Sequence, residues 1–407
     1  MRILHTADWH LGKNLEGHSR LKEQEAFLND FVNIVEDKHI DLVIIAGDVY
    51  DTSNPPAQAE KLFYDTLKKI SKNGERIILV IAGNHDNPER LVAAGPLAME
   101  HGIIMVGTPK TVVRVGQYGK HEIIASGEGY IEVAIGEEKA VILTVPYPSE
   151  KRLNEVLYHD MEQAEDRAVT YGERIKSLFD SLKTHYREDT INLVVSHLFA
   201  MNSEESGSER SIQLGGSYIV GGDCFPEEAQ YIALGHVHKP QLVPGTHGRA
   251  RYSGSPLQYN KKEINFVKQC LAIEVTADSE AIVEEISLPV YKPIEIWKCP
   301  SIEAAIERCE AEKDRDCYVY LEVESDRYIR EDEIKKMKTS KADILEILPK
   351  LQGSEEEERG LERQITEESV EDIFKAFYKK ERGVDVEEEV LQVLMSILNE
   401  EENDETH

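Results

Sequence analysis

Five short motifs, spread from residue 8 to residue 238, carry side chains that commonly bind metal ions. They are Asp8-Trp9-His10, Gly47-Asp48-Val49-Tyr50-Asp51, Gly83-Asn84-His85-Asp86, His197 alone, and Gly235-His236-Val237-His238. Divalent ions that activate water favour carboxylate and imidazole ligands over thiolates. Taken together and in this order, the motifs predict a two-metal site that hydrolyses phosphate esters.

The candidate ligands all offer oxygen or nitrogen donors: Asp8, His10, Asp48, Asn84, His197, His236 and His238. Such a set suits two ions that share one ligand, and a carboxylate is the natural bridge. Asp48, in the middle of the set, is the expected bridge. Two ions about 3.5–4 Å apart can hold a hydroxide and stabilise both the attacking and the leaving oxygen. Because Asn84 is neutral, the site keeps a surplus of positive charge that attracts a phosphodiester.

His85 is a further candidate, with a different role. In an extended backbone its side chain points away from that of its neighbour Asn84, which leaves it available for proton transfer. With an ordinary pKa of about 6.5, an imidazole can protonate a leaving alkoxide. We expect Asp86 to orient His85, as carboxylates beside metal sites often do.

Each motif follows an apolar run that is typical of a buried strand. These runs cover residues 2–7, 42–47, 77–83, 191–195 and 231–235. Continuous β-branched runs indicate strands that are covered on both faces. Helical patterns over 27–35 and 62–70 alternate with the first runs and predict α/β layering. In such sheets, functional residues gather at the carboxyl ends of the strands, where all five motifs lie.

The remaining segments have different patterns. Residues 111–145 are rich in Val, Ile and Gly and predict antiparallel hairpins. Residues 151–186 show a polar helical pattern, and residues 202–222 predict a long polar loop after His197. Such a loop is either functional or simply disordered.

No further motif follows residue 288, and we predict a catalytic domain over 1–288. Residues 289–350 alternate strand and helix patterns and predict a small α/β domain. Residues 351–366 contain four successive glutamates and are typical of an acidic linker. Two amphipathic helical patterns follow within 367–407. Since few apolar residues nearby could cover their apolar faces, these helices would suit a groove on a partner protein. The alternative is that they pack on their own chain.

Each motif has a structural alternative when taken alone. Asp-x-His is common by chance, and a lone His197 is more often a core histidine. Only its place at a strand end, between the other motifs, makes His197 a ligand candidate. Four histidines lack such a context, and we expect them to be structural: His5, His159, His185 and His247.

Composition limits the other functions that the chain can have. The net charge is −30, and residues 351–407 alone hold 6 Lys and Arg against 19 Asp and Glu. Any nucleic-acid contact must therefore use local cations, metal ions or a partner. The five cysteines have no C-x-x-C spacing and are expected to be reduced structural thiols. With no secretory signal and no membrane-spanning run, we expect a cytoplasmic protein.

The motifs resemble those of the calcineurin-like metallophosphoesterase superfamily. The longer segments 6–12, 46–52, 79–86 and 231–238 are similar to those of the bacterial SbcD exonuclease family, as is Tyr-Ser-Gly-Ser-Pro at 252–256. This resemblance implies a layered β-sandwich flanked by helices, followed by a small α/β capping domain and C-terminal helices.

The resemblance also implies a function. It implies a two-manganese nuclease that works with the coiled-coil ATPase SbcC as a double-strand exonuclease and single-strand endonuclease that opens DNA hairpins. It further implies a homodimer within a heterotetramer, with the C-terminal helices docked on SbcC. One ion would take Asp8, His10, Asp48 and His238. The other would take Asp48, Asn84, His197 and His236, and His85 would be the catalytic histidine.

Basic residues that flank the motifs are candidates for DNA contact, because phosphates are bound by such side chains. The nearest are Lys13, His18, Arg20, Arg90 and Lys239, with Lys22, Arg249, Arg251, Lys261 and Lys262 further away. Each alone could be a solvated surface charge. No motif that reads bases is present, so we expect no sequence specificity.

Two other functions remain compatible with the motifs. The first is a phosphatase or cyclic-nucleotide phosphodiesterase of the same fold, although a compact phosphatase does not need the last 120 or so residues. The second is a non-catalytic scaffold that bridges DNA and an ATPase, against which the complete ligand set and His85 argue. The identity of the ion is also open, because Mn, Fe, Co and Zn all accept these ligands.

Overall fold

The computed structural model describes residues 1–149, 171–207, 209, 219–351 and 391. The chain divides into two compact units. The first comprises Met1–Ile296, Asp314–Tyr320 and Asp343–Glu346, and the second comprises Trp297–Lys313, Leu321–Ala342 and Ile347–His407. The predicted linker at 351–366 and the predicted helices at 367–407 lie outside the described residues, apart from Leu351 and Leu391.

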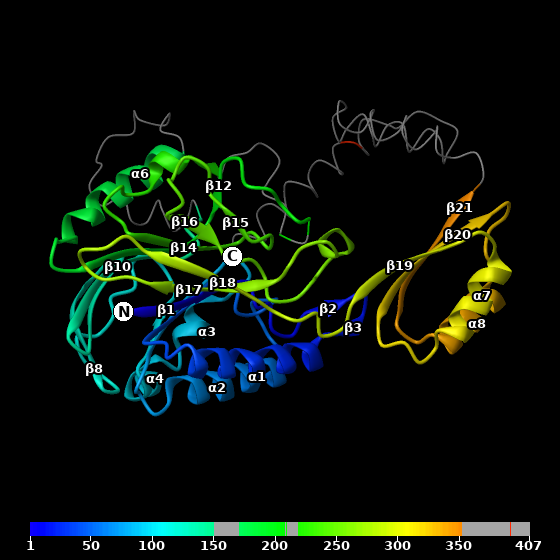
Figure 1. Ribbon diagram of the computed structural model, residues 1–407, viewed down its shortest axis with the longest axis horizontal. Coiled ribbons are helices and arrows are strands. Elements are labelled where there is room, and N and C mark those ends of the chain that lie inside the picture. The colour runs from blue at the N-terminus through cyan, green and yellow to red at the C-terminus, as the bar shows by residue number, and fades with distance from the viewer. Residues whose placement is uncertain (150–170, 208, 210–218, 352–390, 392–407) are drawn as a thin grey trace. The chain divides into compact units, whose positions relative to one another are not determined.

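Two β-sheets form the centre of the first unit (Figure 1). The six-stranded sheet has the order β18-β17-β1-β4-β5-β6, with bounds Ile282–Ser287, Gln269–Glu274, Arg2–Thr6, Leu42–Ala46, Ile77–Ile81 and Ile103–Val106. Its strands β1, β4, β5 and β6 are parallel. The carboxyl ends of β1, β4 and β5 therefore lie at one edge of this sheet.

The eight-stranded sheet has the order β15-β16-β14-β11-β10-β9-β8-β7, with bounds Gln241–Leu242, Ala250–Tyr252, Tyr231–Gly235, Ile191–His197, Glu138–Val145, Tyr130–Ile135, His121–Gly127 and Gly116–Tyr118. Strands β14, β11 and β10 are parallel, and β7 to β10 form antiparallel hairpins. The predicted hairpins over 111–145 are thus confirmed. Two short pairs lie outside both sheets, β2 (Asn14–Leu15) with β3 (His18–Ser19) and β12 (Phe199–Ala200) with β13 (Ile219–Val220).

Hydrophobic side chains on alternate strand positions divide between two layers. Ile3 and Ile44 share one buried core with Ile142 and Leu193 of the second sheet. Their neighbours, such as Val43, turn to the opposite face and join the core under the helices. Because strand side chains alternate between the two faces, strands buried on both sides must be apolar throughout. This explains the continuous runs in the sequence.

Helices cover the outer face of each sheet, as Figure 1 shows. Helices α1 (Leu21–Asp37) and α2 (Ala57–Ser71) pack on the first sheet, where Phe27 and Phe63 join its core. Helix α6 (Tyr171–Leu182) packs on the second sheet. Short helices α3 (Pro88–Val92) and α4 (Gly95–Ala98) follow β5, and 3-10 turns span Met99–His101, Lys183–His185, Gly222–Cys224 and Lys261–Glu263. The predicted layered sandwich flanked by helices is confirmed.

The C-terminal part of the described chain has its own small sheet, with the order β19-β20-β21. Its elements alternate as strand, helix, strand, helix and strand, as the sequence predicts: β19 (Ile294–Cys299), α7 (Ile302–Ala311), β20 (Tyr318–Ser325), α8 (Glu331–Ser340) and β21 (Ile344–Leu351). The Ser301 side chain accepts a hydrogen bond from the Ala304 amide and so caps α7. The predicted boundary at 288/289 lies just before β19.

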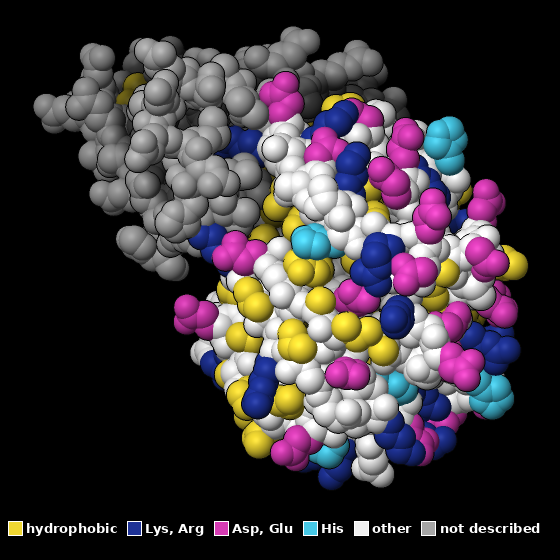
Figure 2. Space-filling model, turned by 90° about the vertical axis from the view of Figure 1, so that its left-hand side faces the viewer, with side chains coloured by type: hydrophobic (Ala, Val, Ile, Leu, Met, Phe, Trp, Pro, Cys, Tyr) yellow, Lys and Arg dark blue, Asp and Glu magenta, His cyan; other side chains and the backbone are white. Residues whose placement is uncertain are grey.

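Two surface properties bear on partners. None of the helices in the described ranges combines the length and the hydropathy that a membrane-spanning helix needs. On the face drawn in Figure 2, Lys and Arg side chains alternate with Asp and Glu side chains. The described residues of this face therefore present no continuous basic surface for DNA.

All five cysteines are buried and reduced, as predicted.

Candidate metal centre

The carboxyl ends of five strands bring all seven candidate ligands into one cluster. His197 is the last residue of β11, and Asp8, Asp48, Asn84 and His236 lie one to three residues beyond β1, β4, β5 and β14. Backbone hydrogen bonds fasten the first two loops together, since the Asp8 amide donates to Gly47 O at 3.1 Å and the His10 amide to Asp48 O at 3.0 Å. The convergence follows from the parallel strand order.

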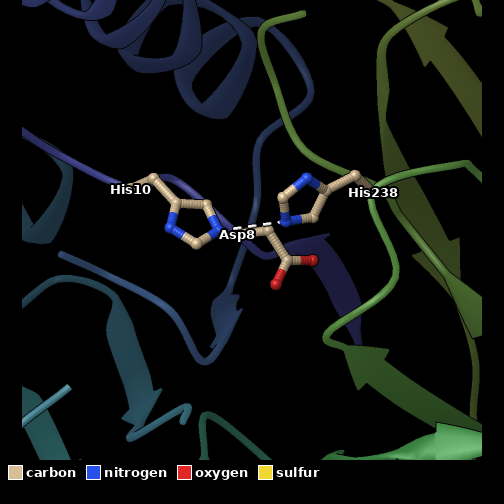
Figure 3. Close-up of side chains that lie close together, drawn as sticks. All are labelled: Asp8, His10 and His238. Atoms are coloured by element: carbon tan, nitrogen blue, oxygen red, sulfur yellow. Dashed lines mark hydrogen bonds between the residues drawn. The ribbon is translucent and has the colours of Figure 1, made fainter. Parts of the chain in front are cut away.

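The first half of the cluster consists of Asp8, His10 and His238. Figure 3 shows the two imidazoles directed at each other, with 3.0 Å between their Nε2 atoms. The Oδ1 atom of Asp8 accepts from the His236 amide at 2.9 Å. Its other oxygen, Oδ2, is buried and has no hydrogen-bond partner among the described residues. Burying a carboxylate oxygen without a partner costs free energy. A cation bound by these three side chains would give that oxygen a partner.

The second half consists of Asp48, His197 and His236, with Asn84 beside them. The Oδ1 atom of Asn84 lies 3.0 Å from His197 Nε2 and 3.0 Å from His236 Nδ1. On its other side, His197 Nδ1 faces the carbonyl oxygen of Ala46 at 2.9 Å. A carbonyl can only accept, so Nδ1 carries a hydrogen there and Nε2 is the nitrogen that can bind an ion.

Asp48 lies between the two halves. Its Oδ2 is 3.6 Å from His10 Nε2 and 3.4 Å from His197 Nε2. Its Oδ1 accepts from the His85 amide at 2.9 Å, which fixes the carboxylate plane. One oxygen of Asp48 therefore faces ligands of both halves, as a bridging carboxylate would.

The backbone at the cluster is unusual, in a way that sequence patterns do not reveal. Four of the candidate ligands have positive φ angles, namely Asp8 (54°), His10 (44°), Asp48 (47°) and His236 (99°). Non-glycine residues seldom adopt this conformation, and when they do they concentrate at functional sites. Close approach adds a second constraint: a Cβ at Gly235 would overlap the Ala46 carbonyl, and one at Gly83 would overlap Asp48.

Burial and charge act against each other in the centre. Burial lowers the pKa of both His10 and His236 to about 3, so both imidazoles are neutral and can bind a metal. Burial alone would raise the pKa of Asp48, yet the surrounding imidazoles, His197 foremost, hold it well below its usual range. Burial would likewise lower the pKa of His197, but the Asp48 carboxylate outweighs it and raises that pKa to about 9. The proton on His197 thus occupies a place that a metal ion would take.

His85 lies beside the first half of the cluster. Its ring packs edge-on against His10 at 4.6 Å between centroids, and its Nε2 is 4.0 Å from Asp48 Oδ2. The prediction that Asp86 orients His85 is corrected by the geometry, because the group that faces His85 Nδ1, at 2.8 Å, is the carbonyl of Asp51. The chain bends at 84–86 and is not extended there, which directs Asp86 toward the backbone instead.

The carboxylate of Asp86 shapes the loops around the centre. It accepts hydrogen bonds from the amides of Gly83 at 2.9 Å, Val49 at 3.1 Å and Tyr50 at 2.9 Å. Asp86 thereby joins the loop after β5 to the loop after β4. Although burial raises the pKa of Asp86 to about 6, these three donors favour its ionised form.

Three residues near the centre were missed at the level of sequence. Asp51 Oδ1 lies 3.4 Å from His10 Nδ1 and is paired with Lys13 at 2.6 Å. Glu263 and Lys268 form a buried ion pair next to His238. Asp51 ends the second motif and could have been found there, whereas no sequence signal points to the other two.

The structure distinguishes among the DNA-contact candidates. Arg20 is corrected: it is 1% exposed, donates to Glu23 at 2.8 Å and to the Gln258 carbonyl at 2.6 Å, and so cannot reach a phosphate. Lys13 is partly exposed and lies next to Asp51. Lys239 pairs with Glu204 and directly follows a candidate ligand. Arg90 pairs with Glu60 on the α2 side.

The other basic candidates lie further from the cluster. His18 is half-buried beside Tyr318, and Lys22 is exposed at the start of α1. Arg249 donates to the carbonyls of Pro226, Glu227 and Ala229 and so holds the loop before β14. Arg251, Lys261 and Lys262 lie in β16 and in the turn before β17, where Arg251 lies near Glu285 and Lys261 near Glu346.

Two family profiles match the chain. The calcineurin-like phosphoesterase family matches residues 1–240, which hold all seven candidate ligands and His85. The family described as the type 5 capsule protein repressor C-terminal domain matches residues 290–382. The interval between them contains the end of the sandwich, including β16, β17 and β18.

Named relatives are similar over nearly the whole chain. The SbcD subunit of the nuclease SbcCD from Bacillus subtilis (strain 168) is 38% identical over 98% of this chain and 97% of its own length. The protein of the same name from Rhodobacter capsulatus is 31% identical over 81% of this chain and 82% of its own. The one from Escherichia coli (strain K12) is 27% identical over 92% of each.

Solved structures give a weaker likeness. A dimetal phosphatase from Danio rerio is 11% identical, with a TM-score of 0.37 over 71% of this chain and 97% of its own. The named relatives cover more of this chain, 81% to 98% of it, and the phosphoesterase profile matches more than half of it. On their evidence, this chain belongs to the SbcD family within the calcineurin-like phosphoesterases.

Proposed function

We propose that this chain is the nuclease subunit of an SbcCD-type complex and hydrolyses phosphodiester bonds in DNA. The relatives named as SbcD subunits of the nuclease SbcCD support this proposal, as does the calcineurin-like phosphoesterase domain. With an SbcC-type ATPase, it would degrade double-stranded DNA ends and open hairpins during replication, recombination and repair. Since DNA is the substrate, we also propose a cytoplasmic location.

The position of Asp48 is the observation that carries this proposal. A single oxygen of its carboxylate faces His10 at 3.6 Å and His197 at 3.4 Å, so one residue serves both halves of the cluster. Two adjacent cations that share a carboxylate are suited to phosphate ester hydrolysis. The proposed ligand sets are Asp8, His10, Asp48 and His238 for one ion, and Asp48, Asn84, His197 and His236 for the other.

The ions themselves are proposed to be manganese. The donors are oxygen and nitrogen atoms only, which suits Mn²⁺, and no cysteine is in the cluster. When bound, a pair of such ions activates a water molecule and neutralises charge on the phosphate. The chain itself holds the ligand-bearing loops in position. It does so through the hydrogen bonds that Asp86 accepts and through the close packing of Gly83 on Asp48 and of Gly235 on Ala46.

His85 is the proposed proton donor to the leaving oxygen. The Asp51 carbonyl holds Nδ1 as a donor, and Nε2 points toward Asp48 and the cluster. Its side chain is 8% exposed, so water has little access to it. A proton on Nε2 could then pass to an oxygen held beside Asp48, which is the role of a general acid.

We propose that the regions after residue 288 bind partners. The second family profile, over 290–382, supports a capping domain at 289–350, after a catalytic domain at 1–288. Residues 351–366 would be the linker, and 367–407 would dock on the coiled coil of the ATPase. The relatives are named as one component of a nuclease with several subunits, which supports a partner. The assembly of two copies of each subunit is our proposal from the family resemblance.

Nuclease assays test this function. The purified chain would be incubated with end-labelled hairpin and blunt DNA, alone and with its ATPase partner, in Mn²⁺, Mg²⁺ or Zn²⁺. We expect Mn²⁺-dependent cleavage that the ATPase and ATP enhance. Intact DNA under all of these conditions would refute the proposal. Turnover of p-nitrophenyl phosphate without any DNA cleavage would favour a phosphatase of the same fold.

A further inference from the structure

A buried ion pair lies directly behind His238. The Glu263 carboxylate and the Lys268 ammonium group are 2.5 Å apart, with side chains 0% and 2% exposed. A buried pair of this kind is costly to desolvate and is weak evidence for stability. Its other contacts are therefore the better guide to its role.

Lys268 holds the backbone of His238. Its Nζ atom donates to the His238 carbonyl at 3.2 Å and to Ser255 Oγ at 2.8 Å, besides its contact with Glu263. These three acceptors match the three hydrogens of an ammonium group. Lys268 thus ties the loop after β14 to the segment that leads into β17.

Glu263 faces the ring of the same histidine. Its Oε1 lies 3.6 Å from His238 Nδ1, while His238 Nε2 points the opposite way, 3.0 Å from His10 Nε2. The Ser206 hydroxyl donates to Glu263 at 3.0 Å and the Tyr259 amide at 3.2 Å, so the carboxylate is itself held in place. The separation from His238 is that of a charge contact and is longer than a hydrogen bond.

The imidazoles of the two halves have different groups behind them. His238 has the Glu263 carboxylate near its Nδ1, and His10 has Asp51 at 3.4 Å. His197 has a backbone carbonyl in that position, at 2.9 Å. A carboxylate behind a ligating imidazole orients the ring and raises its basicity. Of these three imidazoles, the two in the first half are therefore the ones that have a carboxylate behind them.

We propose that Glu263 and Lys268 are positioning residues that hold His238, ring and backbone together, for the metal ion bound with Asp8 and His10. This inference rests on the proposed two-metal function and adds to it a specific dependence of one ion site. Neither residue would touch DNA or the reacting atoms. Their removal should weaken one ion site and leave the other intact.

Titration of the protein with Mn²⁺, without DNA, tests this proposal. Calorimetry measures the binding affinities, and electron paramagnetic resonance measures the spin coupling between the bound ions. The double variant Glu263→Leu/Lys268→Met removes both charges and fills their place with apolar groups, which avoids an unpaired buried charge. We expect one of the two Mn²⁺ binding events to weaken about 10- to 100-fold, while the other keeps its affinity. The spin coupling between the two ions should disappear at Mn²⁺ concentrations that still saturate the wild type.

A matched control is Glu36→Gln/Arg76→Met, which removes an ion pair at 2.6 Å on the α1 side of the first sheet. We expect its Mn²⁺ binding to be unchanged. The inference would be overturned if the double variant Glu263→Leu/Lys268→Met bound both Mn²⁺ ions with wild-type affinity. It would also be overturned if both binding events weakened equally. If the double variant does not fold, Glu263→Gln, which keeps the shape, is judged by the same criteria. If the wild type itself fails to bind two ions, the proposed function fails instead.

Discussion

The Nδ1 atom of His85 lies 2.8 Å from the carbonyl oxygen of Asp51. Because this oxygen can only accept, Nδ1 carries a hydrogen and the imidazole is held in one tautomer. The remaining nitrogen, Nε2, then faces the cluster, 4.0 Å from Asp48. A single backbone carbonyl thus determines which nitrogen of His85 can exchange a proton.

His85→Gln should abolish most of the cleavage without emptying the centre. Glutamine can still donate to the Asp51 carbonyl but cannot transfer a proton, so we expect DNA cleavage to fall by about 10²- to 10⁴-fold. Mn²⁺ stoichiometry and DNA affinity should be retained. His247→Gln, on an exposed loop, is the control and should cleave normally. Unchanged cleavage by His85→Gln would exclude His85 as the proton donor.

Asp48→Asn should affect both ions at once. Its Oδ2 faces ligands of each half, so loss of the negative charge should weaken both binding events, unlike a change at a ligand of one half. Elemental analysis after gel filtration would report fewer than two ions per chain. Asp41→Asn, which changes a carboxylate that accepts from the Arg2 amide, is the matched control. Retention of two ions by Asp48→Asn would refute the bridging role.

Removal of metal should destabilise the first unit. Ligands come from the loops of both sheets, and an ion that binds only the folded state stabilises it by about 2.7 kcal/mol at 100 times its Kd. For a unit of roughly 300 residues, that corresponds to about 4 °C in Tm for each ion. Calorimetry with and without a chelator measures it. An identical Tm in both samples would show that the cluster binds no ion under those conditions.

His5 should make the protein sensitive to acid. It is buried between the sheets, with Nδ1 2.9 Å from the Tyr231 hydroxyl, and burial lowers its pKa from 6.5 to about 3. The unfolded chain therefore takes up a proton below pH 6.5 that the folded chain refuses until about pH 3. Stability due to neutral His5 is complete above pH 6.5 and falls as pH drops, by about 1.4 kcal/mol per pH unit within this window.

Urea denaturation between pH 4 and pH 7 tests the role of His5. The variant His5→Phe/Tyr231→Phe replaces both polar partners with apolar groups, which can be nearly neutral at pH 7. Its free energy of unfolding should depend less steeply on pH, because one proton fewer is taken up on unfolding. Tyr231→Phe alone keeps the imidazole and should retain the wild-type slope. An equal slope in the double variant would contradict the prediction.

Gly235→Ala should damage the fold and the centre together. A Cβ there would overlap the carbonyl oxygen of Ala46, so the ends of the two sheets would have to separate. We expect a loss of stability of about 1–3 kcal/mol and weaker Mn²⁺ binding. Gly95→Ala is the control, because nothing lies within 4 Å of its added Cβ. Chemical denaturation and Mn²⁺ titration of both variants measure these effects.

The features that were predictable from sequence share one physical origin. A continuous apolar run followed by Asp48, or by His236, predicts a strand end, and parallel strand ends meet at one edge. The same strand-end argument predicts a place in the cluster even for His197, which stands alone without neighbouring ligand candidates. The layered sandwich follows from the same runs, because strands buried on both faces need cover on both sides.

Other features depend on packing between distant segments. Arg20 looks like a surface cation in the sequence, but the rings of Tyr259 and Tyr318 lie about its guanidinium group and bury it. Glu263 and Lys268 contact His238 from the segment before β17, where the sequence shows no helical or strand pattern. The bend at 84–86 turns Asp86 toward backbone amides, and the glycine before it lies where a Cβ would overlap Asp48, a residue of another strand end.

The two sheets contribute ligands from separate parts of the chain. Asp8, Asp48 and Asn84 follow strands near the amino terminus, whereas His197 and His236 come about a hundred residues or more later. Since chains are made from the amino terminus, a growing polypeptide has only part of the centre until residue 238 has left the ribosome. Truncated products that end before β14 would therefore lack His236 and His238, and hydrolytic competence would appear only after more than half of the chain has been made.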